Sequence, residues 1–451
     1  MHGTMNKPAL PTTSQLEWAE QEIGAIIHFD MQVYDPSYYY YDAMKTLRRP
    51  PDIKLFNPKE LDTDQWVEAA VSFGAKYAVL VAKHCSGFSL WPTKMHAYSV
   101  KSSPWRKGKG DIVADFIKSC EKFGIKPGLY CSAGRNSYMN VYDHKVASGD
   151  PRELARYNKV LETQLTELWS NYGKLFEIWF DGGVTPPEDG GPDLLPILRK
   201  FQPDAVVFEG PRDWPSLLRW PGNERGEAPD PFWNTTSSLA AEDGDGIVEK
   251  AGLGGNPNGS RWIPGECDMP NRDQHQASQG GWFWRKGDDK FLYSLDHLTG
   301  CYFSSVGRNT NLLLGMVIDN RGLVPEPDFK RFTEFGRQIK KIFSDCLGKT
   351  HGEGKSMTLR LTEGKTANML VIMEDIAHGE RIRKYIVEAL VGGAWTKILE
   401  GTCVGHKRIG RFAPLKASEI RLVIVESAGT PKIREFSAWM AGENLFHRNE
   451  P

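Results

Sequence analysis

Two acidic residues follow segments that are typical of buried parallel strands, and together they could hydrolyse a glycosidic bond. Asp181 directly follows the mostly apolar segment 176–180, and Glu224 lies in the similarly placed segment 219–226. In a parallel (β/α) barrel, an acidic residue at the carboxyl end of such a strand points into the active-site mouth. Two carboxyl groups that face each other across a mouth are the usual catalytic pair of glycoside hydrolases.

Each acid also has a simpler interpretation, and other acids compete for the second catalytic role. Asp181 could belong to an Asp-Gly turn after an ordinary strand, and Glu224, which precedes Arg225, could be a solvated loop residue. Glu209 and Glu266 each end an apparent strand as well, so both are rival acids.

Four further side chains are predicted in the same mouth. His28 and His84 each close an apolar segment, and Tyr130 ends the third expected strand. Trp179 precedes Asp181 by two residues, so both side chains lie on the same face of their strand. Packing in the core is the alternative for each of these side chains.

Other chemistries have less support. Cys85 could act as a nucleophile only with an orienting base, and His84, its neighbour on a strand, is expected to point the opposite way. His84 and Cys85 are also the only adjacent histidine and cysteine in the chain, so no metal and no cofactor are expected. The seven cysteines are scattered and odd in number, which indicates a reducing compartment rather than a disulfide framework.

Length and charge limit the class of protein. A chain of 451 residues is too long for one compact core, so two domains are expected. The 56 basic and 57 acidic residues are mixed, so neither nucleic acid nor an anionic membrane is an expected partner. No apolar run approaches the roughly 18 residues of a membrane span, and the polar start has no apolar signal-peptide core. A cytoplasmic location is therefore favoured, with a secreted or periplasmic one open if a leader has been removed.

Strand and helix patterns alternate through the first three quarters of the chain. This alternation is typical of parallel βαβ units and predicts a (β/α)8-like barrel. The expected strands cover 23–29, 76–84, 125–132, 176–181 and 204–210, and the expected helices cover 63–74, 111–124, 153–173, 192–202, 287–304 and 325–345.

Beyond Gly348 the pattern changes to short β-branched or alternating runs joined by turns. Such runs predict an antiparallel β-sandwich of roughly 100 residues. The predicted domains are therefore a catalytic barrel over 1–347 and a sandwich over 348–451. Because no low-complexity linker separates them, the sandwich should pack firmly against the barrel.

The motif-bearing segments together resemble the α-L-fucosidases of glycoside hydrolase family 29 over essentially the whole chain. The best matches are YAVLVAKH, LWPTKMHAYSVKSSPWRKGKGDIVADF, EIWFDGG, WPGNERG, GGWFW and SVGRNTNLLL. The resemblance is strongest to the branch that acts on α-1,3- and α-1,4-linked fucose, in which a W-x-G-[ND]-E-x-G segment carries the acid/base. It implies a retaining exo-hydrolase of fucosylated oligosaccharides, with Asp181 as nucleophile and Glu224 as acid/base.

The resemblance also implies which side chains bind the sugar. His28 and His84 match positions that hydrogen-bond fucose hydroxyl groups, and a tryptophan ring of the GGWFW segment could pack on the C6 methyl. The expected substrate-binding residues are His28, His84, Cys85, Tyr130, Trp179, Glu266, Trp282 and Trp284. The sequence makes no prediction of oligomeric state.

The chain departs from its relatives in the sugar pocket. Cys85 replaces a second sugar-binding histidine of the K-H-H-D-G-F motif, Asp30 replaces a glycine, and Gly134 stands where relatives read S-P-W. The usual Glu-Trp pair in the first long loop is replaced by the tyrosine run at 38–41 and Asp42. Two alternatives stay open: an α-L-galactosidase or related α-L-glycosidase, and a catalytically inactive carbohydrate-binding relative.

Overall fold

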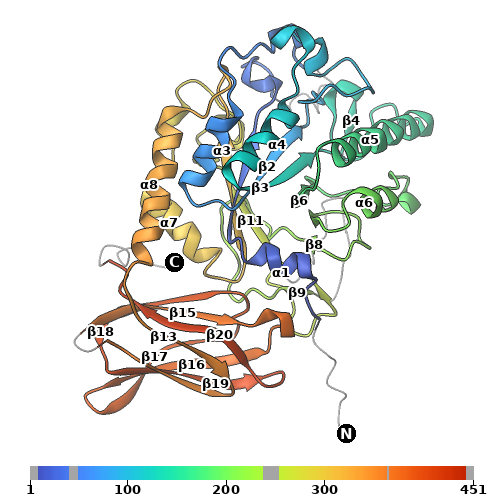
Figure 1. Cartoon of the computed structure of the whole chain (residues 1–451). Helices are drawn as coiled ribbons and strands as arrows, with labels where there is room; N and C mark the ends of the chain where they lie inside the picture. Colours follow the sequence, from blue (N-terminus) through green and yellow to red (C-terminus); the bar gives the residue numbers. More distant parts are fainter. Residues whose placement is uncertain (1–8, 40–48, 237–252, 363–364, 443–451) are drawn as a thin grey trace.

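The computed structural model describes residues 9–39, 49–236, 253–362 and 365–442 of the chain (Figure 1). Tyr40, Tyr41 and Asp42, named above among the departures from relatives, lie outside these residues. The first part of the chain forms the predicted barrel, an eight-stranded parallel sheet. In spatial order its strands are β11 (Glu266–Met269), β12 (Asn311–Val317), β1 (Ile23–His28), β2 (Tyr77–Lys83), β3 (Lys126–Cys131), β6 (Glu177–Trp179), β7 (Val206–Phe208) and β8 (Leu217–Leu218).

The barrel closes between its first and last strands in this order. Arg219, directly after β8, forms a parallel bridge with Gly265, directly before β11. The Arg219 amide donates to the carbonyl oxygen of Pro264 at 3.0 Å, and the Glu266 amide donates to the carbonyl oxygen of Arg219 at 3.1 Å. This closure brings β11 next to the loop that follows β8, which carries Glu224.

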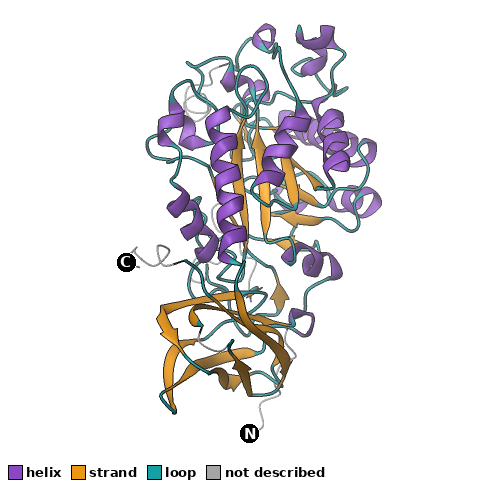
Figure 2. Ribbon diagram, turned by 60° about the vertical axis from the view of Figure 1, so that its left-hand side comes forward, coloured by secondary structure: helices purple, strands orange, loops and turns teal. Residues whose placement is uncertain are grey.

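Helices surround the barrel, as Figure 2 shows. They are α1 (Thr13–Ala19), α3 (Thr63–Ser72), α4 (Ile112–Phe123), α5 (Pro151–Asn171), α6 (Leu195–Phe201), α7 (Leu295–Ser304) and α8 (Glu326–Ile342). Short hairpins are formed by β4 (Val141–Tyr142) with β5 (Lys145–Val146) and by β9 (Thr235–Thr236) with β10 (Arg261–Trp262). Single 3-10 turns lie at Met31–Val33, Ile53–Leu55, Val100–Ser102, Trp105–Gly108, Ser137–Met139, Pro187–Asp189, Ser278–Gly281, Asp288–Phe291 and Ile376–His378.

Local capping explains where the helices begin. Asp111 caps α4 by accepting a hydrogen bond from the Ala114 amide, and Gly124 ends that helix with a left-handed φ of 66°. The single helix predicted over 287–304 is wrong at its start, because the Ser294 side chain caps α7 by accepting from the His297 amide. No described helix is long and apolar enough to cross a membrane.

The two faces of the barrel strands pack into different layers. Because residues alternate along a strand, one set of side chains points into the barrel and the other points toward the helices. The interior cluster contains Ile26, Val79, Val81, Tyr130, Trp179, Phe208 and Leu313, with Trp18 of α1. The cluster beneath the helices contains Ile27, Leu80, Leu129, Ile178 and Val207. Burial on both faces explains why these strands are almost continuously apolar in sequence.

The last part of the chain is the predicted antiparallel sandwich. One sheet has the order β13 (Cys346–Glu353), β20 (Lys432–Trp439), β15 (Thr366–Glu374) and β18 (Arg408–Lys416). The other has the order β14 (Ser356–Arg360), β19 (Glu419–Ser427), β16 (Ile382–Val391) and β17 (Ala394–Gly401). Leu370, Val387, Leu422 and Phe436 lie in the core between the sheets. Since β13 begins at Cys346, the predicted boundary at 347 falls at the start of this strand.

The sandwich packs against the end of the barrel where the strands begin. Ile376 joins the interior cluster of the barrel beside Trp18, and Lys407 pairs with Glu22, the residue before β1. The carboxyl end of β1, at His28, is therefore at the opposite end of the barrel, and Figure 1 shows this separation. The sandwich supports the barrel from below and leaves the mouth to loops of the barrel itself.

Candidate active site

Asp181 lies directly beyond β6, in a turn with left-handed φ angles of 68° at Gly182 and 75° at Gly183. Glycine adopts this conformation without the strain that a Cβ atom adds. The Tyr130 hydroxyl donates a hydrogen bond to Oδ2 of Asp181 at 2.9 Å. This contact follows from strand pairing, because Tyr130 on β3 is in register with Trp179 on β6. The neighbouring strand thus orients the carboxylate.

Glu224 lies in the loop after β8 and is held by a tryptophan. Trp282 donates its indole N–H to Oε2 of Glu224 at 3.0 Å. Burial raises the pKa of Glu224 above its ordinary value, and the nearby charge of Asp181 raises it further. Each effect favours the protonated carboxyl, which is the form that a catalytic acid needs. The two acids therefore share one mouth, and the charge of Asp181 favours the protonated form of Glu224.

His28 and His84 line this mouth together with aromatic rings. Their ring centroids are 6.0 Å apart, and the His28 centroid is 4.9 Å from that of Trp282. The His84 ring stacks on Tyr130 at 5.8 Å, and Tyr130 stacks on Trp179 at 5.3 Å. Burial lowers the pKa of His28 well below its ordinary value and that of His84 to about 3. Both imidazoles are therefore neutral, and each can donate one hydrogen bond and accept another.

The prediction that Glu266 ends a strand is wrong, because Glu266 begins β11 and therefore lies deeper in the barrel than the two acids. Its fully buried carboxyl accepts hydrogen bonds from the Tyr77 hydroxyl and from the Trp179 indole, the latter at 2.9 Å. Burial, with the charge of Glu266, holds the pKa of Glu177 well above its ordinary value. Trp18 donates to Oε2 of Glu177 at 3.2 Å. These contacts place Glu266 beneath Trp179, where it supports the floor of the mouth.

The other rival acid and the second tryptophan are placed differently. Glu209, directly after β7, is buried and has a left-handed φ of 49°, and its amide donates to the carbonyl oxygen of Leu218. Trp284 packs against the apolar layer beneath the helices. Of the GGWFW segment, Trp282 is thus the tryptophan that the structure brings to Glu224.

Cys85 corrects one expectation about side-chain direction. His84 and Cys85 do not point to opposite sides, because Sγ of Cys85 lies 4.0 Å from Nε2 of His84. The alternation rule fails because β2 ends at Lys83 and the chain then turns, with the Gly87 amide donating to the carbonyl oxygen of His84. One ligand atom from each of His84, Cys85 and Asp181 lies within 4.8 Å of the others.

A second buried acid, Asp268, lies beside Glu224 and was not predicted from the sequence. Asp268 lies on β11, two residues after Glu266, and accepts a hydrogen bond from the Trp220 indole at 2.8 Å. Burial raises the pKa of Asp268 well above its ordinary value, and the charge of Glu224 adds to this effect. Glu266 and Asp268 are two residues apart on one strand, so their side chains share a face. This spacing is the sequence signal that could have identified Asp268.

Two other polar residues lie near the mouth. Arg135 was not predicted there, and Asp30 was noted only as a departure from relatives. The positive charge of Arg135 lowers the pKa of both Glu224 and His84, which places it close to the site. Asp30 is buried behind Cys85, and its Oδ1 accepts from the Ser86 hydroxyl at 2.6 Å and from the Met31 amide at 2.7 Å. Burial raises the pKa of Asp30 to about 7.

The chain is similar to known proteins in both sequence and fold. A sequence model described as alpha-L-fucosidase matches residues 3–342. Alpha-L-fucosidase 1 of Arabidopsis thaliana is 30% identical over 464 residues, which cover 93% of this chain and 85% of the plant protein. A crystal structure of a candidate α-L-fucosidase from Bacteroides thetaiotaomicron VPI-5482 has a TM-score of 0.90 at 38% identity and covers 96% of this chain and 100% of its own.

A glycoside hydrolase 29 family member from an unknown rumen bacterium has a TM-score of 0.81 at 30% identity, covering 97% of this chain and 78% of its own. These similarities extend over both the barrel and the sandwich. They agree with a mouth that holds two carboxyl groups among histidine and tryptophan rings. The chain belongs to the α-L-fucosidase family and is a glycoside hydrolase.

Proposed function

We propose that this protein is a retaining exo-α-L-fucosidase that releases terminal α-1,3- or α-1,4-linked L-fucose from oligosaccharides. The observation that carries the proposal is the pairing of Asp181 and Glu224 in one mouth, each held by an aromatic donor. Family membership supports fucose as the sugar. The WPGNERG segment around Glu224 supports the linkage, because it matches the acid/base segment of the α-1,3/1,4 branch.

The first step forms a covalent sugar ester. A carboxylate oxygen of Asp181 bonds to the anomeric carbon while the bond from that carbon to the leaving oxygen breaks. Glu224 transfers its proton to the leaving oxygen, so the aglycone departs as a neutral alcohol. The hydrogen bond from Tyr130 holds Asp181 in line for this attack.

The second step releases the sugar. Once Asp181 is an ester it no longer carries the charge that raises the pKa of Glu224. The pKa of Glu224 therefore falls, and its carboxylate can take a proton from water as the water oxygen bonds to the anomeric carbon. The bond from the anomeric carbon to Asp181 breaks in the same step, which restores both the Asp181 carboxylate and the protonated Glu224.

The neutral side chains of His28 and His84 and the nearby ring of Trp282 are suited to binding a deoxy sugar. His28 and His84 can pair with hydroxyl groups as donors or acceptors, and the Trp282 ring offers an apolar face close to His28. A site built to pair a hydroxyl group discriminates strongly against a sugar that lacks it. Placement of the substrate by these side chains is part of the proposal.

An α-L-galactosidase is the second candidate function, because of the polar group behind Cys85. Asp30 and Ser86 form a buried hydrogen-bonded pair there, and the other carboxylate oxygen of Asp30 has no hydrogen-bond partner among the described residues. Such an oxygen could accept a hydrogen bond from an extra sugar hydroxyl. This candidate keeps the same catalytic pair and changes only the sugar.

The test measures the sugar, the linkage and the stereochemistry on the purified protein. Rates are compared on nitrophenyl α-L-fucoside, nitrophenyl α-L-galactoside and Lewis-type oligosaccharides, and NMR follows the first anomer released. We expect fucose of the α configuration, with higher kcat/KM on a branched oligosaccharide than on the aryl fucoside. First release of the β anomer would contradict retention, faster α-L-galactoside hydrolysis would favour the second candidate, and no hydrolysis would favour an inactive carbohydrate-binding relative.

A further inference from the structure

The side chains of His84, Cys85 and Asp181 form an unusual group for a glycosidase mouth. They combine one ring nitrogen, one sulfur and one carboxylate oxygen, and these atoms lie within 4.8 Å of one another. His84 and Cys85 are buried, whereas Asp181 is partly exposed, so the group can be reached from the mouth. The thiol is here because Cys85 occupies the turn after β2 rather than a strand position.

These three donor types are those that zinc and cadmium ions prefer. Zinc is bound by cysteine sulfur at about 2.3 Å and by histidine nitrogen and carboxylate oxygen at about 2.0–2.2 Å, in tetrahedral geometry. Such a site needs its donor atoms roughly 3.3–3.7 Å apart, by the geometry of those bond lengths. The 4.8 Å limit of this group therefore requires side-chain movement of about 1 Å. Three protein donors leave the fourth position to water.

The charge of the group also matches a divalent cation. When a metal–Sγ bond forms, Cys85 gives up its proton to solvent, so thiolate and carboxylate together balance two positive charges. Arg135 opposes a cation, since its positive charge already acts on both His84 and Cys85. The balance favours a soft, thiolate-binding ion over magnesium or calcium, which prefer oxygen ligands.

We propose that His84, Cys85 and Asp181 form a site for a thiophilic divalent cation, such as Zn²⁺ or Cd²⁺, and that its occupancy reversibly blocks the active site. The metal is an inhibitor in this proposal and takes no part in the reaction. The inhibitory half rests on the proposed function, because it requires Asp181 to be the nucleophile. The binding half depends only on the three donors.

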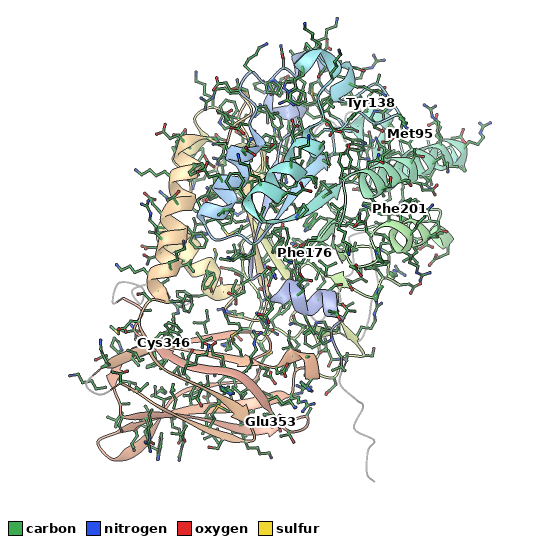
Figure 3. The ribbon with its side chains drawn as sticks, viewed as in Figure 1. Met95, Tyr138, Phe176, Phe201, Cys346 and Glu353 are labelled. Atoms are coloured by element: carbon green, nitrogen blue, oxygen red, sulfur yellow. The ribbon has the colours of Figure 1, made fainter. Side chains whose placement is uncertain are left out.

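Binding is tested first, without any activity measurement. Cd²⁺ is titrated into the protein while the thiolate-to-metal charge-transfer absorption is followed. The parent for this titration is Cys346→Ser, because Cys346 is the exposed cysteine and lies in the sandwich away from the mouth (Figure 3). We expect one equivalent of Cd²⁺ to produce the band in this parent, and Cys85→Ser in the same background to lose it.

A control covers the risk that Cys85→Ser does not fold. Circular dichroism must show a native spectrum for the variant, and Cys85→Ala replaces it otherwise. A measurement on the unsubstituted protein gives independent support, because free L-fucose should suppress the Cd²⁺ band by competing for Asp181. A band that persists in both Cys85 variants, or no band in the parent, would overturn the proposal.

Inhibition is tested second. Zn²⁺ should inhibit hydrolysis of nitrophenyl α-L-fucoside competitively, with recovery after EDTA. Each variant is compared with its own metal-free rate, and Cys85→Ser should raise the inhibition constant by at least about tenfold, a loss that matches one ligand. Cys346→Ser should leave both the rate and the inhibition constant unchanged. Equal inhibition of Cys85→Ser and the parent would place the inhibitory metal elsewhere.

The two proposals fail in different ways. If the protein binds Cd²⁺ through Cys85 but hydrolyses no glycoside, the proposed function is wrong and the metal site stands. If hydrolysis is normal and no charge-transfer band forms, the metal site is wrong and the proposed function stands.

Discussion

At the residue scale, each proposed catalytic acid accepts a hydrogen bond from one neighbouring aromatic side chain. Tyr130 orients Asp181, and Trp282 orients Glu224. Because the charge of Asp181 raises the pKa of Glu224, removal of Asp181 should lower the pKa of Glu224. The behaviour of single substitutions therefore reports on the pair.

Asp181→Ala should lower kcat by several orders of magnitude, because the carboxylate that forms the sugar ester is gone. Azide or formate should restore part of the rate on an aryl fucoside by occupying the space of the missing carboxylate. Initial rates with and without these anions measure the effect. Activity of Asp181→Ala close to that of the parent would end this assignment.

Glu224→Ala should be severely impaired on an oligosaccharide, whose leaving group must be protonated. Its first step on a nitrophenyl fucoside should suffer much less, because that leaving group needs little protonation. The same pair of substrates is measured with Glu266→Ala and Glu209→Ala as controls. If either control shows this pattern and Glu224→Ala does not, the acid/base is the other glutamate.

Asp268→Asn tests whether the second acid beside Glu224 is neutral during catalysis. A protonated Asp268 resembles asparagine in charge and shape, and Oδ1 of asparagine can still accept from Trp220. We therefore expect kcat/KM within a few-fold of the parent and an unchanged alkaline limb in its pH profile. If Asp268 were ionised, its removal would lower the pKa of Glu224 and move that limb to lower pH.

At the element scale, the loop that carries Glu224 packs closely against β11 and α7. The Gly226 amide donates to the carbonyl oxygen of Asp268 at 3.1 Å, and Cys301 of α7 donates to the carbonyl oxygen of Arg225 at 3.3 Å. Gly226 has a left-handed φ of 68°, and a Cβ atom there would lie 2.6 Å from the sulfur of Met269. The loop that carries Glu224 is thus held by a close contact at a position that favours glycine.

Gly226→Ala should displace this loop and lower kcat on an oligosaccharide by about tenfold or more, since a 1 Å shift of a catalytic group can cost about 100-fold. Gly392→Ala is the matched control, because Gly392 has a similar φ of 60° with nothing within 4 Å of the added carbon. Both variants should lose about 1–2 kcal/mol of unfolding free energy from backbone strain. Equal activity of the two variants would show that the loop does not position Glu224.

At the scale of the whole molecule, the buried carboxyl group of Glu380 joins the sandwich to the barrel, and that of Glu374 lies inside the sandwich. Glu380 accepts hydrogen bonds from the Asn234 amide at 3.1 Å and from the Asn309 side chain at 2.5 Å. Glu374 accepts from the Gly405 amide at 2.9 Å. Burial raises the pKa of Glu374 and of Glu380 to about 7. The interface is therefore sensitive to pH although it is far from the mouth.

The contribution of Glu374 and Glu380 to the unfolding free energy should fall as the pH rises from about 4.5 to about 7. In this window the folded protein keeps protons on Glu374 and Glu380 that the unfolded chain has lost, so a higher pH favours unfolding. Urea unfolding at several pH values measures the slope. Glu380→Gln should flatten it, whereas Glu426→Gln at an exposed position of β19 should not. An unchanged slope in Glu380→Gln would exclude this interface as its source.

Much of the fold follows from local pattern. Alternating strands and helices predicted the barrel, and short β-branched runs predicted the sandwich, which the structure and the family comparison confirm. The barrel strands β8 and β12, the sandwich strands β13 and β20, and the helix α1 were missed. The pattern of β13 alternates between buried and exposed residues that include glycine and charged side chains, so its pairing with β20 decides its structure.

The sequence alone determined which residues stand at strand ends, and hence that Asp181, His28 and Tyr130 share one mouth. That inference needs only the period of two along a strand and the common direction of parallel strands. Only the tertiary structure decided how the other acids are distributed. Closure between Arg219 and Gly265 puts Asp268 beside Glu224 and leaves Glu266 lower in the barrel.

The tertiary structure also decides that the side chains of His84 and Cys85 lie close together. Alternation predicts opposite directions for neighbours on a strand, but the position at which β2 gives way to a turn depends on contacts with other parts of the barrel. The period of two along a strand predicts which face of the sheet a side chain occupies. This prediction holds only as far as the strand extends. The height of each residue in the barrel, and its neighbours across the mouth, depend on contacts between segments far apart in the chain.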